Sequence, residues 1–127
     1  MNVPEDLKYT KDHEWVRIDG DIATIGITDF AQGELGDIVY VEIETLNQAL
    51  VAETVFGSVE AVKTVSDLFM PISGEIIEIN EAIEDSPETV NEDPYGDGWM
   101  VRIQYSDMLQ LEGLIDAKAY KAIIAGE

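Results

Sequence analysis

The sequence predicts a mainly β protein: a flattened antiparallel sandwich of two related halves, with short helices and a C-terminal helix. Apolar and polar residues alternate in short segments along most of the chain, as half-buried strands require. Asp19-Gly20 separates two such segments and is a strong hairpin signal. The segment LGDIVYV (35–41) is echoed by SGEIIEI (73–79), which indicates two related halves.

The first half is expected to begin with a hairpin and a short helix. Residues 13–18 and 22–27 flank the Asp19-Gly20 turn as its two strands. Thr28 or Asp29 is placed to cap a helix that runs through Glu34, because hydroxyl and carboxylate side chains accept hydrogen bonds from the first helical amides. Gly36 is expected to end that helix.

The middle of the chain is expected to supply three more strands. They are predicted at 37–44, 55–62 and 75–79, where apolar residues recur at period two. An irregular link at 45–54 joins the first two, and it lacks both Pro and Gly. A turn at 71–74 (PISG) precedes the third.

The last third changes character. Residues 80–98 are acidic and contain two prolines, which indicates a surface loop with one helical turn near 87–91. Residues 99–105 are predicted to form the last strand, and apolar spacing beyond residue 106 is typical of a helix. The length of 127 residues suits a single domain over 1–127, with a core of about 12–105 and a C-terminal helical segment of about 106–125.

The charge balance excludes several partners. With 27 acidic and 7 basic residues, the net charge is −20. Nucleic acid and anionic membrane surfaces need a basic footprint, so neither is an expected partner. Apolar runs are too short to span a bilayer, and the first residues have no apolar or Arg-rich leader character, which favours a cytoplasmic protein.

The chain holds few groups that do chemistry. It has no cysteine and one histidine, His13, so thiolate metal sites, thiol nucleophiles and clustered histidine ligands are excluded. Phosphate-binding glycine motifs are absent as well. These absences disfavour an enzyme that acts alone.

One lysine stands apart from the others. Lys63 is the only lysine between residues 12 and 117, and it shares its strand parity with Val55, Val59, Ala61 and Val65. A straight strand would bury its ammonium among them at a cost of several kcal/mol, on the order of the penalty for an unpaired charge. The chain is therefore expected to turn near Lys63 and to place it at a hairpin tip, with Glu60 and Asp67 near its flanks.

Three interpretations of Lys63 remain open from the residues alone. It is a solvated turn lysine, a Schiff-base lysine, or an exposed anchor for a covalent group. Neighbouring acids raise a lysine pKa, whereas Schiff-base chemistry needs a lowered one, so the second is disfavoured. A borrowed cofactor would make up for the missing built-in chemistry, which favours the third.

Four segments of the chain carry a resemblance to a known family. LKYTKDHEWVRIDG, ATIGITDFAQGELGDIVYVE, FGSVEAVKTVSDLFMPISGEIIEIN and DSPETVNEDPYGDGWMVRI together resemble the H proteins of the glycine cleavage system. The resemblance implies a barrel-sandwich hybrid, related to lipoyl and biotinyl domains, with lipoic acid in amide linkage on Lys63. Biotinyl domains present Ala-Met-Lys-Met and other lipoyl domains Asp-Lys-Ala, whereas this chain has Glu60-Ala-Val-Lys63.

The resemblance also implies a mobile, non-catalytic carrier in glycine catabolism. Its lipoyl arm takes an aminomethyl group from the pyridoxal-phosphate glycine decarboxylase (P protein) to a tetrahydrofolate-dependent aminomethyltransferase (T protein). Dihydrolipoyl dehydrogenase (L protein) then reoxidises it, and a lipoyl-attaching enzyme modifies Lys63. Two alternatives stay open: a relay that hands octanoyl or lipoyl groups to other proteins, and an H-like interaction module without cofactor.

Members of this family shelter the loaded arm in a surface cleft. By motif position, Glu14 is the expected partner of the arm's amine, with Asp67 behind it and Asp12 at the rim. Glu60 is expected to be read by the modifying enzyme and the partner enzymes. These roles follow from the resemblance and from charge and position.

Four aromatic or heterocyclic side chains are assigned no chemistry. His13 and Trp15 alternate with Glu14 and are expected to face away from it, Trp15 as a core residue and His13 as a hydrogen-bonded structural residue. Trp99 is expected to pack against the DPYGDGW loop, and Phe30 stands where some relatives have histidine.

Overall fold

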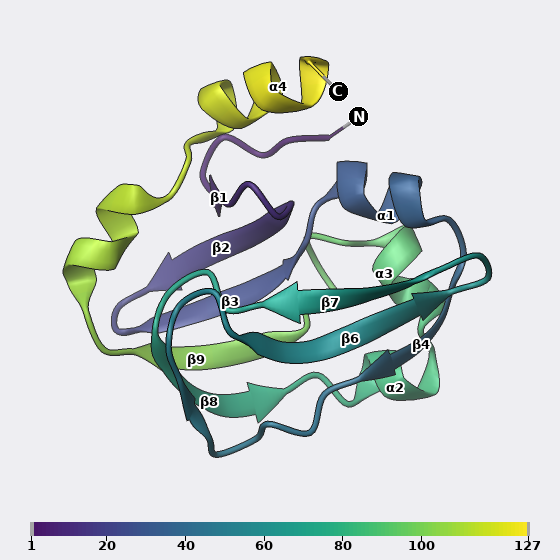
Figure 1. Cartoon of the computed structure of the whole chain (residues 1–127), viewed down its shortest axis with the longest axis horizontal. Helices are drawn as coiled ribbons and strands as arrows, with labels where there is room; N and C mark the ends of the chain where they lie inside the picture. The colour runs from purple at the N-terminus through teal and green to yellow at the C-terminus, as the bar shows by residue number, and fades with distance from the viewer. Residues whose placement is uncertain (1, 127) are drawn as a thin grey trace.

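The computed structural model describes residues 2–126 and shows the predicted antiparallel β-sandwich (Figure 1). One sheet has the strand order β1-β2-β3-β9-β8-β5 and the other β4-β6-β7. In chain order the elements are β1 (Lys8–Tyr9), β2 (Glu14–Asp19), β3 (Ile22–Ile27), α1 (Asp29–Leu35), β4 (Ile38–Glu42), β5 (Ala49–Leu50), β6 (Val55–Ala61), β7 (Val65–Phe69), β8 (Gly74–Ile79), α2 (Ala82–Asp85), α3 (Glu88–Glu92), β9 (Val101–Tyr105), the 3-10 helix η1 (Met108–Gly113) and α4 (Ala117–Ala125). No helix among these residues is long and apolar enough to cross a membrane.

The predicted hairpin and short helix are confirmed, although the turn lies at 20–21, one residue later than expected, because Asp19 is the last residue of β2. β2 and β3 pair from Glu14↔Ile27 to Asp19↔Ile22, with Gly20 at a φ of 64° in the turn. A positive φ at the first central position suits the right-handed twist of a hairpin. The Thr28 side chain accepts from the amide of Ala31 and caps α1, which Gly36 ends.

The segments of the internal echo lie in different sheets, as two halves of a sandwich would. Their glycines nevertheless serve different purposes. Gly36 has a φ of 80° and closes α1. Gly74 begins β8, where a Cβ atom would lie 2.6 Å from the carbonyl oxygen of Gln104. The echo thus repeats a sequence pattern rather than a backbone geometry.

Short elements were missed at three places. The N-terminal strand β1 was not predicted, and the link 45–54 contains β5, which pairs with β8. The acidic loop holds two helical turns, α2 and α3, where one was expected. The C-terminal helical segment is also interrupted, because η1 and α4 are separated by Leu114–Asp116. Two-residue strands and single helical turns are too short to show a period.

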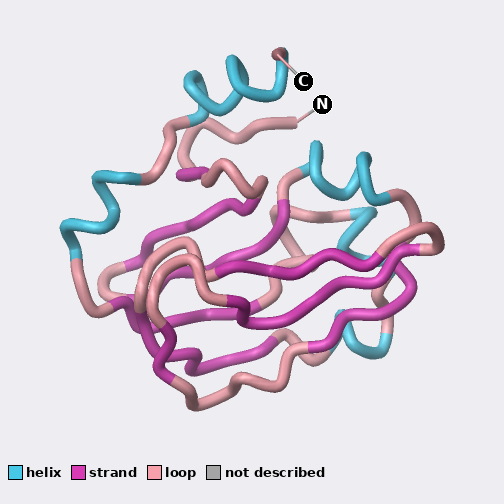
Figure 2. The backbone as a smooth tube through the Cα atoms, in the orientation of Figure 1, coloured by secondary structure: helices cyan, strands magenta, loops and turns pink. Residues whose placement is uncertain are grey.

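Two apolar clusters hold the fold together. The larger lies between the sheets and includes Ile25, Val59, Met70 and Ile103. The smaller joins the N-terminal segment to α4 and contains Val3, Leu7, Tyr9, Trp15, Ala117 and Tyr120. Figure 2 shows the N-terminal segment and α4 side by side, and the rings of Tyr9 and Tyr120 stack at 4.6 Å. The predicted core of about 12–105 leaves out most of this second cluster.

Candidate functional site

Lys63 lies at the tip of the β6–β7 hairpin, as predicted. The strands pair up to Glu60↔Val65, and the amide of Ala61 donates to the carbonyl oxygen of Thr64 at 2.8 Å, which leaves Val62 and Lys63 as the turn. Both are exposed. Among the described residues neither has a positive φ, so the turn needs no glycine. This explains why residue composition does not reveal it.

Lys63 stays out of the core, as predicted, but two valines that share its parity in the sequence are also outside the core, which was not expected. Val59 and Ala61 are buried, whereas Val55 and Val65 are exposed. A β-bulge between Val55 and Gly57 shifts the alternation, so that Phe56 enters the core instead. Across the two-residue turn, Val65 pairs with Glu60 and shares the outer face of the sheet with it.

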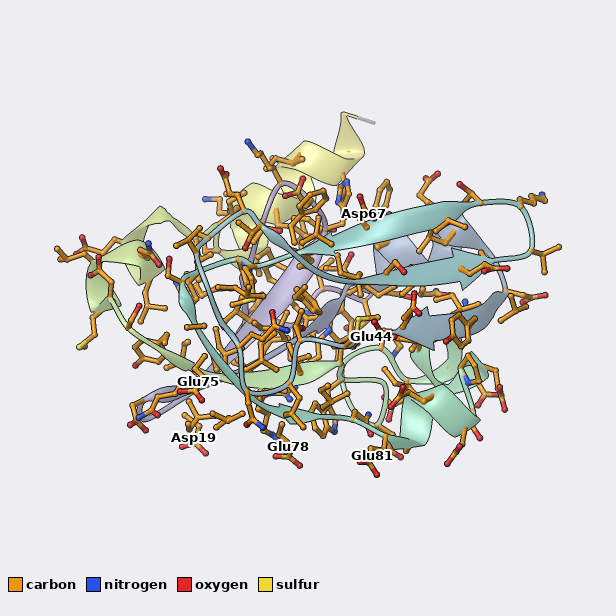
Figure 3. The ribbon with its side chains drawn as sticks, turned by 60° about the horizontal axis from the view of Figure 1, so that its bottom comes forward. Asp19, Glu44, Asp67, Glu75, Glu78 and Glu81 are labelled. Carbon is orange, nitrogen blue, oxygen red and sulfur yellow. The ribbon has the colours of Figure 1, made fainter. Side chains whose placement is uncertain are left out.

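A cleft of about 370 Å³ opens beside this hairpin, between β7, α1 and the start of β2. We call it the cleft. Its lining residues are Asp12, His13, Glu14, Ile27, Phe30, Ala31, Glu34, Leu35, Val59, Ser66, Asp67 and Leu68. The three acids expected at such a site are therefore brought together, and Figure 3 labels Asp67 on β7.

Glu14 is the buried acid of the cleft. The residue is only 2% exposed, and its Oε2 accepts the amide N–H of Phe69 at 2.7 Å. Burial raises the pKa of Glu14 to about 8, with a smaller contribution from the charge of Asp12. The hydrogen bonds from Phe69 and Thr10 act in the opposite direction. The carboxyl is thus mostly protonated at neutral pH, when the cleft holds no cation.

A tight loop presents Glu14 to the cleft. The hydroxyl oxygen of Thr10 accepts the amides of Asp12 and Glu14 at 3.2 and 3.3 Å and lies 3.4 Å from Glu14 Oε1. The Thr10 amide in turn donates to the carbonyl of Glu14 at 3.0 Å. Sequence reasoning missed Thr10; its position four residues before Glu14 in a turn-rich segment was the available signal.

His13 differs from its expected orientation. It lines the cleft on the same side as Glu14, because its φ of 65° places it outside the strand, where alternation does not apply. Its Nδ1 lies 2.8 Å from the hydroxyl of Tyr120, which also hydrogen-bonds Thr28 at 2.7 Å. The predicted hydrogen bond of His13 is confirmed. Tyr120 thereby links α4 to the wall of the cleft.

The remaining predicted acids are exposed. Asp12 and Asp67 stand at the edge of the cleft, together with Glu34, which the sequence analysis did not single out. Glu60 is exposed on the outer face of the β4-β6-β7 sheet and does not line the cleft. Asp67 pairs with Ser58, further from the tip than Glu60, so it is not a flank of Lys63 as expected.

The tryptophans have packing roles. Trp15 is fully buried, as predicted, and its indole N–H donates to the carbonyl oxygen of Pro94 at 2.8 Å. Trp99 is partly buried, and its backbone carbonyl accepts from the side-chain amide of Asn80 at 2.7 Å, which joins the two ends of the acidic loop. Phe30 packs against His13 in the cleft wall, 4.9 Å between ring centroids. Across residues 2–126, no group of His, Cys, Asp and Glu side chains suits a metal ion.

Comparison with known proteins agrees with this geometry. The family model described as "Glycine cleavage H-protein" matches residues 7–127. A glycine cleavage system H protein of Bacteroides thetaiotaomicron is 56% identical over 99% of this chain and 100% of its own length. One from Chlorobium phaeobacteroides is 59% identical over 98% of each chain. The crystal structure of a glycine cleavage system H protein from Mycobacterium marinum superposes with a TM-score of 0.86 at 38% identity, covering 97% of this chain and 99% of that one.

Proposed function

This chain belongs to the glycine cleavage H-protein family, and we propose that it carries a lipoyl group on Lys63 as the mobile carrier of the glycine cleavage system. One observation carries the proposal. Lys63, the only lysine between residues 12 and 117, is exposed at a hairpin tip, and the cleft that holds Glu14 runs along the same hairpin.

The distance from the hairpin tip to the cleft suits the length of a lipoyl-lysine side chain. Ser66 lines the cleft three residues from Lys63, roughly 10 Å along a strand. A lipoyl-lysine side chain of about a dozen bonds extends roughly 14 Å from its Cα atom. The arm is therefore long enough to fold back from the tip into the cleft, and also to project away from the protein.

Bound to Lys63, the lipoyl group would supply a disulfide whose S–S bond opens to take the aminomethyl group on one sulfur and a proton on the other, while the carboxyl group of glycine leaves as carbon dioxide. The chain itself supplies the shelter. Glu14 offers a carboxyl to a protonated amine that enters the cleft, and the amine's charge favours release of the Glu14 proton. Asp12 and Asp67 add negative charge at the entrance. The apolar walls exclude water from the amine.

The outer face of the hairpin is the proposed recognition surface. Glu60 lies there between Tyr40 and Val65, which are its cross-strand partners. Val62 and Val65 are 72% and 63% exposed, so apolar area surrounds the acid close to Lys63. An enzyme that must grip the hairpin to reach the lysine finds its contacts here. We expect Glu60→Lys to slow lipoylation; an unchanged rate would remove Glu60 from this role.

The complete cycle is part of the proposal. Glycine decarboxylase loads the arm, the aminomethyltransferase unloads it, and dihydrolipoyl dehydrogenase reoxidises it, while this chain acts as the carrier component. A relay in lipoate assembly would use the same lysine. Exchange of labelled carbon dioxide into glycine with purified glycine decarboxylase separates the two roles, because only the carrier supports it.

Mass spectrometry of the protein purified from its own host tests the attachment site. We expect a lipoyl amide on Lys63 and none on Lys118 or Lys121, which lie exposed in α4 and serve as internal controls. A bare Lys63 in an extract whose other lipoyl proteins are modified would contradict the proposal.

A further inference from the structure

A second hollow lies along β8 and shares no lining residue with the cleft. It measures about 410 Å³, and Leu46, Ile77 and Trp99 contribute apolar surface to its lining. We call it the β8 groove. Leu46 is 46% exposed and Ile77 39%, so this apolar surface faces solvent. The groove lies mainly on the six-stranded sheet, whereas Lys63 belongs to the three-stranded one.

The backbone builds the groove. Ile76 pairs with Ile103 and Glu78 with Arg102, which leaves Ile77 as the extra residue of a β-bulge, exposed together with Glu78. Leu46 is held alongside by the neighbouring link, where the Asn47 amide donates to the carbonyl of Ile76 at 2.7 Å. Because bulges re-aim side chains, the exposure of Ile77 is a property of the fold and not of one flexible side chain.

The rim of the groove is acidic. Glu78, Glu81 and Glu84 all line it, and Figure 3 shows Glu78 and Glu81 along one edge of the molecule together with Glu75 and Asp19. One cation stands among them. Arg102 bonds Glu78 at 2.8 Å and lies 4.0 Å above the ring of Trp99. The carboxylates outnumber it, so the groove presents a negative field around an apolar floor.

We propose that the β8 groove docks a protein segment that presents lysine or arginine side chains around one apolar side chain, on an enzyme that the carrier serves. The inference rests on the proposed carrier function. The apolar floor supplies an anchoring contact, and the carboxylates steer and orient a cationic partner. A second copy of this chain is a poor occupant, since each copy has a net charge of −20.

The location of the groove gives this docking a use. Lys63 has to reach the active site of each partner, and the outer face of the hairpin is the contact proposed there. The β8 groove would be a second contact, separate from the hairpin. A surface with no residue in common with the cleft can hold a partner while the arm moves. Because both contacts belong to one folded chain, binding at the groove would raise the effective concentration of the arm at the partner's active site.

The test compares two variants that each lose three charges. The groove variant is Glu78→Gln, Glu81→Gln and Glu84→Gln; the control is Glu5→Gln, Glu92→Gln and Glu112→Gln, at exposed positions outside the groove. Each is made in the Lys63→Ala background, so that no arm contributes to binding. Affinities are measured by calorimetry against purified glycine decarboxylase, aminomethyltransferase and dihydrolipoyl dehydrogenase, at low and high salt. A Leu46→Ser variant probes the floor.

We expect the groove variant to weaken binding to at least one enzyme about tenfold, the effect of losing a few interface contacts. Leu46→Ser should weaken binding to the same enzyme, and the control variant should change the affinity by less than about twofold. Equal losses in the groove and control variants, or no loss with any enzyme, would overturn the proposal. Self-association that the groove variant abolishes would assign the surface to a second copy instead. None of these outcomes affects lipoylation of Lys63, which tests the carrier function separately.

Discussion

The cleft and the β8 groove both place carboxylates next to apolar side chains, yet the two regions use them in different ways. In the cleft, Glu14 is 2% exposed and its pKa is raised to about 8, so burial favours its neutral form. In the β8 groove, the side chain of Glu78 is 52% exposed and paired with Arg102. The two acids are of the same residue type, so burial decides whether the carboxyl group is protonated or is ionised and contributes negative charge to the surface.

The strongest test of this difference is at Glu14, where we expect the largest effect on the free energy of unfolding. The folded state keeps this proton up to a pH of about 8, whereas an unfolded glutamate loses it near 4.5. Between these values the folded state binds more protons, so the free energy of unfolding should fall as pH rises. Glu14→Gln removes this loss and should be more stable than the parent above pH 8, by on the order of a few kcal/mol.

Denaturant unfolding across this pH range measures the difference, and Glu78→Gln is the matched control. The Glu78 side chain is solvated, so the free energy of unfolding of Glu78→Gln should vary with pH in parallel with that of the parent. If the profiles of Glu14→Gln and the parent also ran parallel, Glu14 would not be a buried, protonated acid.

A smaller effect is expected at Thr10, which holds the loop that carries Glu14. Thr10→Val removes an acceptor from the amides of Asp12 and Glu14 and should cost about 1–2 kcal/mol of folding free energy. It also removes a hydrogen bond that lowers the pKa of Glu14, so that pKa should rise further. Carboxyl NMR titration reads out the pKa, and Thr10→Ser should restore both values. A loss of stability with no change in the pKa would limit Thr10 to a structural role.

The smallest effect is expected at Arg102 in the β8 groove. Arg102→Gln removes an exposed ion pair with Glu78 and a contact with Trp99, together worth about 1 kcal/mol at such a site. It also makes the groove more negative and should strengthen binding of a cationic partner. Thermal unfolding and the calorimetric assay check the two expectations; a large loss of stability would mean that the groove is part of the core.

Short-range sequence patterns predicted most of the fold. The Asp19-Gly20 hairpin and the cap of α1 were predictable, because turn and cap residues act through their own backbone neighbourhood. The position of Lys63 was also predictable, because an unpaired ammonium is too costly to bury among valines. The errors at Val55 and Val65 have a different origin: a bulge and a two-residue turn change parity through strand pairing, which a single strand does not reveal.

The sequence by itself determined the β class, the exposed lysine, the scarcity of built-in chemistry and the family resemblance. These follow from composition, short-range pattern and motif order. Only the tertiary structure decided that Glu14 is buried with a raised pKa and that His13 lines the cleft, where Tyr120 of α4 hydrogen-bonds it. It also decided that a bulge exposes Ile77 in the β8 groove. Each of these depends on segments far apart in the chain, since solvation and strand register are set by what packs around a residue rather than by its neighbours in sequence.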